Sequence, residues 1–217
     1  MKLLRHPASC KLAAIVAAGL VIGCLGSSPT IEFYTMNAAS DPVFSAVPDS
    51  LAIGVGPIRV PRYLDRPEWV TRPGGSTSRL EINGVRRWAG GFSTNVLSAL
   101  GENLGIKLNT QQVVVYPSLI AIPLDYRIGV NFQAFEVIDK DALVLRANWV
   151  IRAGKAGGGS WSGHFATRRS IVGGSPDGFV AAHNEALDLL ASTIASRIES
   201  LAKARASTEG SENQHAN

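Results

Sequence analysis

Alternation of apolar and polar residues is strongest between residues 143 and 152. Every second position there is apolar, and three of the five positions between are polar: Leu143, Leu145, Ala147, Trp149 and Ile151 alternate with Val144, Arg146, Asn148, Val150 and Arg152. A period of two predicts a half-buried β-strand. Residues 127–138 are expected to pair with it across Asp139-Lys140-Asp141, and residues 161–171 continue the antiparallel meander.

Two other segments have the spacing of a helix. Between residues 85 and 104 an apolar residue recurs at every fourth position, which predicts a first helix: Trp88, Phe92, Val96, Leu100 and Leu104. A second helix is expected to begin at Ser175-Pro176-Asp177, where a capping residue, a proline and an acid come together. Its apolar stripe runs from Val180 to Leu201 and should lie on the sheet. Residues 205–217 have no apolar periodicity and are expected to form a disordered tail.

Shorter apolar runs predict further strands in the first half of the chain. They cover residues 31–36, 51–58, 69–71, 78–82 and 111–116. Prolines and glycines separate them, and Pro73-Gly74-Gly75 predicts a turn.

The first 23 residues have the pattern of a secretory signal rather than of a membrane span. A basic start is followed by a short uncharged apolar run that ends at Gly23-Cys24. This ending resembles a lipobox, which implies that residues 1–23 are removed and that Cys24 is lipidated with palmitate-type acyl chains. Leu25 after the cysteine implies sorting to the outer membrane, facing the periplasm. Residues 24–30 are then the anchor and a short linker, which keeps the domain close to the membrane.

Removal of the signal changes the charge and the thiol content. It takes away three of the 21 basic residues and none of the 17 acidic ones, which leaves 18 against 17. A charge near neutrality gives no support for a nucleic-acid partner. The only other cysteine, Cys10, leaves with the signal, so disulfides, zinc–cysteine sites and a cysteine nucleophile are excluded from the mature domain.

Motifs for catalysis are lacking in the rest of the sequence. Three histidines remain, His164, His183 and His215, without an HExxH or GxSxG pattern, and no pair of carboxylates has a motif spacing. His183 lies on the apolar stripe, where a satisfied boundary histidine is favoured over a functional one. The glycine run at 157–159 lacks the Gly-Lys-Ser/Thr ending of a phosphate loop. We therefore expect a protein that is not an enzyme and has no cofactor or metal.

One arrangement conflicts with the predicted first helix. Arg86 and Arg87 would lie at its start, where the positive end of the helix dipole disfavours cations. Either nearby acids compensate them, with Asp65, Glu68 and Glu81 as candidates, or they face an anionic head group or a partner protein, together with Arg62, Arg66 and Arg72.

Several of these stretches resemble the PqiC-type lipoproteins, the auxiliary components of ABC-type, MCE-linked transport systems. The resemblance rests on Val55-Gly56-Pro57-Ile58, on Tyr63-Leu64-Asp65-Arg66-Pro67, on Arg87-Trp88-Ala89 and on Leu145-Arg146-Ala147-Asn148-Trp149. It covers about residues 31–201. The chain departs from the family where Gly90-Gly91-Phe92 replaces the usual Glu-Pro-Leu.

The resemblance implies a fold and a role. The fold is a single α+β domain, residues 31–204, in which a mixed, mainly antiparallel sheet is packed by two amphipathic helices. The role is that of a non-catalytic component that docks an MCE-domain protein for the transport of lipid, or another hydrophobic solute, between the inner and outer membranes. ATP hydrolysis would belong to another subunit, and the implied partners are the MCE-domain protein and its ABC permease system. Candidate contact residues are Tyr63, Asp65, Arg66, Arg87 and Trp88, and ring-like self-association is plausible.

Two other functions stay open on the sequence. The protein could be an envelope lipoprotein that binds cell-wall or other periplasmic enzymes as an interaction module. It could also be a periplasmic hydrolase that uses His164 or His183.

Overall fold

The computed structural model describes residues 29–38, 51–74, 78–119, 121–154 and 158–215. Ile31–Asn217 form one compact unit. Its elements are β1 (Glu32–Tyr34), β2 (Ile53–Arg59), β3 (Glu68–Arg72), β4 (Glu81–Trp88), α2 (Phe92–Lys107), β5 (Val113–Val115), β6 (Tyr126–Ile138), β7 (Ala142–Ala153), β8 (Ser160–Ser170), the short 3-10 turn η2 (Val172–Gly174) and α3 (Pro176–His215). The predicted signal segment and Cys24 lie outside the described residues.

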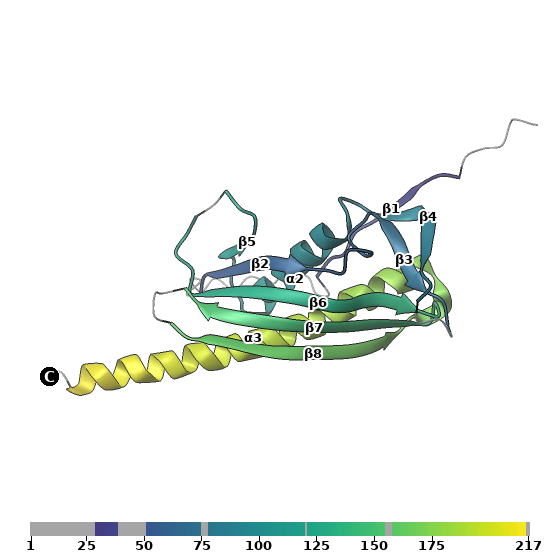
Figure 1. Cartoon of the computed structure of the whole chain (residues 1–217). Coiled ribbons are helices and arrows are strands. Elements are labelled where there is room, and N and C mark those ends of the chain that lie inside the picture. Colours follow the sequence, from purple (N-terminus) through teal and green to yellow (C-terminus); the bar gives the residue numbers. More distant parts are fainter. Residues whose placement is uncertain (1–28, 39–50, 75–77, 120, 155–157, 216–217) are drawn as a thin grey trace, which may run out of the picture. The chain divides into compact units, whose positions relative to one another are not determined.

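The predicted antiparallel meander is confirmed as β6, β7 and β8, which lie side by side in Figure 1. Pairing of β6 with β7 runs from Tyr126↔Ala153 to Ile138↔Ala142. Asp139 and Lys140 turn the chain between them with φ of 57° and 61°. The alternation seen in the sequence puts the odd-numbered residues of β7, from Leu143 to Ile151, in the core.

The other edge of β6 is shared by two strands. β2 runs parallel to its first half and β3 runs parallel to its last two residues. β5 then adds to β2, while β4 and β1 follow β3. Within the described residues four of the seven strand pairs are parallel, but the two long antiparallel pairs of the meander contain most of the paired residues. The sheet is mixed and mainly antiparallel, as expected.

Both helices pack on one face of this sheet. α3 contacts β7 and β8 and passes behind them in Figure 1, while α2 contacts α3, β2 and β5. Ser175 caps α3 as predicted, because its Oγ accepts a hydrogen bond of 3.1 Å from the backbone N–H of Gly178. Leu100 and Leu190 are fully buried between the layers. No helix in the described part of the chain has both the length and the apolar character that a membrane span requires.

The first helix begins later than the sequence predicts. The sequence predicts a strand over residues 78–82, whereas β4 runs from Glu81 to Trp88. Residues 85–88, expected to begin the first helix, are therefore strand. Gly90 and Gly91, with φ of 76° and 91°, then turn the chain, and α2 starts at Phe92. Glycine adopts these angles without the cost that a side chain would add. Arg86 and Arg87 therefore lie on a strand and do not oppose a helix dipole.

The second helix ends later than predicted. α3 continues through the region expected to be a disordered tail and reaches His215. Residues 202–206 are alanine, lysine and arginine, all strong helix formers, and no glycine or proline follows Gly178 before Gly210. Intrinsic helix propensity extends the helix here without an apolar stripe.

Candidate functional site

Two of the predicted contact residues, Arg66 and Arg87, share one carboxylate. Nε of Arg66 donates to Oε2 of Glu68 at 2.9 Å, and Nη2 of Arg87 lies 4.0 Å from Oε1 of the same residue. The Arg66 hydrogen bond is the main cause that lowers the pKa of Glu68. The structure thus brings together the turn before β3 and the end of β4. Both arginine side chains stay partly exposed, although Nε of Arg87 is itself buried and has no hydrogen-bond partner among the described residues.

Asp65 lies in the same turn, next to Arg66 in the sequence. The turn that carries it is closed by the carbonyl of Pro61, which accepts from the N–H groups of Leu64 and Asp65. Its side chain is exposed, and Oδ1 accepts a hydrogen bond of 2.6 Å from the hydroxyl of Ser93 at the start of α2. We call Asp65, Arg66, Glu68 and Arg87 the polar turn surface.

Tyr63 and Trp88 lie elsewhere. Tyr63 is partly buried beside the ion pair of Arg72 and Glu136, and burial raises the pKa of its hydroxyl. Trp88 is 2% exposed and packs among aromatic rings in the core. Its backbone N–H donates to the carbonyl of Pro67 at 2.6 Å, which ties β4 to the turn. Trp88 is thus linked to the polar turn surface through its backbone, while its side chain lies in the core.

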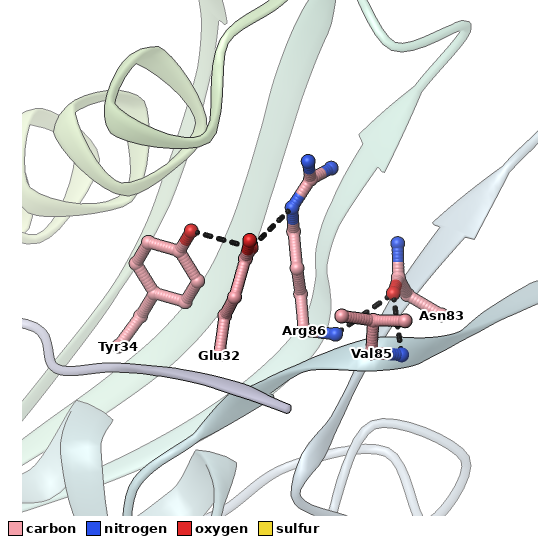
Figure 2. A network of polar contacts seen from close by, with 5 residues as sticks. All are labelled: Glu32, Tyr34, Asn83, Val85 and Arg86. Atoms are coloured by element: carbon pink, nitrogen blue, oxygen red, sulfur yellow. Dashed lines mark hydrogen bonds and ion pairs between the residues drawn. The ribbon is translucent and has the colours of Figure 1, made fainter. Parts of the chain in front are cut away.

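Arg86 has a partner that sequence reasoning missed. Figure 2 shows its guanidinium donating to Glu32 Oε2, at 3.1 Å, and the hydroxyl of Tyr34 donating to the same oxygen at 2.9 Å. Asn83 fixes the backbone of Val85 and Arg86, because its Oδ1 accepts hydrogen bonds from both of their N–H groups. The parallel register of β1 and β4 places Glu32 directly beside Arg86.

A groove on the opposite face of the sheet was also missed. It has a volume of about 800 Å³ and opens on the side of β2, β6 and β7 that the helices leave free. Its polar lining comes from alternating exposed positions of these strands: Arg59, Arg127, Asn131, Asn148 and Arg152. The even-numbered residues 144–152, which face away from the core, were the sequence signal for this exposed sheet face. They did not show that β2 lies beside β6.

The two histidines considered for a hydrolase lie in different surroundings. His183 is buried in the core, and His164 is exposed on β8. Among the described residues no three histidine, cysteine or acidic side chains are close enough to hold a metal ion.

Comparison with known proteins identifies relatives of this fold. The family model for the ABC-type transport auxiliary lipoprotein component matches residues 34–195. The crystal structure of an uncharacterised protein superposes with a TM-score of 0.62 at 18% identity, over 78% of this chain and 99% of the other. A protein from Xanthomonas campestris assigned to family DUF330 gives 0.57 at 16% identity, over 76% of this chain and 92% of the other. No curated protein matches the chain.

Proposed function

Because this chain belongs to the ABC-type transport auxiliary lipoprotein component family, we propose that it is a non-catalytic subunit that docks an MCE-domain protein. The family match over residues 34–195 carries this proposal, since it covers nearly all the strands and most of the helical packing. Together with an ABC permease system, these proteins would move lipid or another hydrophobic solute between the inner and outer membranes, and ATP hydrolysis would occur in another subunit.

The anchor follows from the sequence. Acylation of Cys24 would hold the protein at the outer membrane, facing the periplasm. The family description names a lipoprotein, which agrees with such an anchor. Several acyl chains together give stable attachment to a membrane.

We place the docking contact at the polar turn surface. Its four charged residues come from a turn and two strand ends, and none of the four is fully buried. Arg66 is the best single anchor, because arginine combines a planar donor group with a long apolar stem and is enriched at interfaces. Trp88 contributes by holding the end of β4 in place rather than by touching the partner.

Affinity capture tests this function. The full-length acylated protein is purified from gently solubilised envelopes, and co-purifying proteins are identified by mass spectrometry. Arg66→Ala is compared with Arg197→Ala, a matched control on the exposed side of α3. We expect an MCE-domain protein and its permease with the wild type and the control, and much less of both with Arg66→Ala. Recovery of cell-wall enzymes without any MCE-domain protein would contradict the proposal and favour an interaction module.

A further inference from the structure

The groove on the free sheet face concentrates positive charge. Three of its lining residues are arginines, Arg59, Arg127 and Arg152, and all three are exposed. None of the described residues that line the groove is acidic. Within the described part of the chain these three arginines form no ion pair, unlike Arg66, Arg72 and Arg86.

The register makes this clustering unusual. Arg127 and Arg152 are direct cross-strand partners in β6 and β7, and Arg59 is paired with Asn131 in the neighbouring strand. Like charges directly opposite each other in a sheet are destabilising. Asp125, close to Arg127 in sequence, is already engaged, because it pairs with Arg205 at 3.6 Å and accepts from the N–H of Ala52 at 3.0 Å. An external anion would remove the repulsion.

The surface between the arginines is largely apolar. Pro57 and Val150 line it together with Gly129, which leaves the space above β6 open. A Cβ at Gly129 would lie 3.3 Å from Cγ1 of Val150 and 3.6 Å from the carbonyl oxygen of Pro57. A side chain at this position would therefore crowd the groove.

We propose that this groove binds one anionic amphiphile of the phospholipid type, with its phosphate on Arg127 and Arg152 and an acyl chain along Pro57, Gly129 and Val150. Guanidinium groups bind phosphate through paired, charge-assisted hydrogen bonds. The volume of about 800 Å³ lies in the range of small-ligand sites. The apolar floor distinguishes this ligand from an acidic peptide, which would leave that floor uncovered. The inference goes beyond partner docking, because it gives this subunit a ligand of its own.

Photo-labelling of the purified full-length protein tests the proposal without any partner. The probe is a lysophosphatidylglycerol with a diazirine in its acyl chain, and labelled peptides are identified by mass spectrometry. The variant Arg127→Glu/Arg152→Glu is compared with Arg146→Glu/Arg168→Glu, which makes the same charge change at exposed positions of β7 and β8 outside the groove. Unlabelled lysophosphatidylglycerol, lysophosphatidylcholine, inorganic phosphate and hexaglutamate serve as competitors.

We expect labelling in β6 and β7 that falls at least about tenfold in the groove variant and stays near the wild-type level in the control. Unlabelled lysophosphatidylglycerol should compete better than lysophosphatidylcholine. Equal labelling of the two variants, or labelling spread evenly over the surface, would overturn the proposal. Full competition by inorganic phosphate would show that the groove binds anions without recognising an acyl chain. Competition by hexaglutamate alone would indicate that the groove binds an acidic protein segment. Both results would also overturn it.

Discussion

His183 should make the stability of the protein depend on pH. Its ring lies among aromatic side chains, with centroids 4.6 Å from Phe179, 5.0 Å from Phe135 and 5.2 Å from Trp88. Nδ1–H donates to the carbonyl of Phe179 at 2.8 Å. Burial lowers the pKa of His183 to about 4, from an ordinary value of about 6.5. The imidazole is therefore neutral in the folded protein at neutral pH.

The direction of the effect follows from proton binding. Between the two pKa values the unfolded chain holds a proton on His183 that the folded chain does not, so the free energy of unfolding falls as the pH falls from about 6.5 towards 4. For these two pKa values, the loss between about pH 7.5 and about pH 5 is about 2 kcal/mol.

Urea unfolding at these two pH values measures the loss. His183→Met replaces the ring with an apolar, flexible helix former that does not titrate. Its free energy of unfolding should lose about 2 kcal/mol less than that of the wild type over the same pH interval. His164→Gln, on the exposed face of β8, should behave like the wild type. If wild type and His183→Met lose the same free energy, His183 is not held neutral by burial and the reasoning is refuted.

Two further variants, Glu136→Gln with Glu81→Gln as its control and Ser175→Ala, test single contacts by urea unfolding at neutral pH. Glu136→Gln breaks a two-bond ion pair with Arg72, both bonds 3.1 Å, in which the side chains are only 8% and 17% exposed. It should lower the free energy of unfolding by about 2 kcal/mol, whereas Glu81→Gln, in exposed pairs, should cost under about 1 kcal/mol. Equal costs would contradict the importance of burial. Ser175→Ala removes the cap of α3 and should cost about 1 kcal/mol, and no loss would show that the bond to Gly178 contributes nothing.

Local patterns were sufficient for the meander and for the start of α3. Alternation in residues 143–152 reports burial on one face directly, and Asp139 with Lys140 supplies a turn between two strands of similar length. Ser175 and Pro176 likewise act on their own neighbours. The turn and the helix cap depend on contacts between residues close in sequence, so they can be predicted without knowing the fold.

The errors arose where a local pattern had two interpretations. Trp88 and Phe92 are four residues apart, which suits one helix face, but Trp88 also points inward from the end of a strand. Gly90 and Gly91 between them were the sign of a break. The extension of α3 to His215 depends on helix propensity alone. This part of the chain has no apolar stripe, so the periodicity of apolar residues did not predict it.

The groove and the partner of Arg86 depend on parallel pairing. Glu32 and Arg86 are 54 residues apart, and they meet only because β1 adds to β4 in parallel. Arg59 reaches the groove only because β2 lies beside β6. Parallel partners are joined by long connections, so the sequence gives no local sign of which strands pair.

Photo-crosslinking in living cells tests the central claim, that the polar turn surface docks an MCE-domain protein, most directly. A photoreactive residue is introduced at position 66, and in a separate strain at position 197 on α3 as a control. We predict an adduct with an MCE-domain protein from position 66 and none from position 197. An adduct from position 197 alone, or adducts only with cell-wall enzymes, would contradict the account.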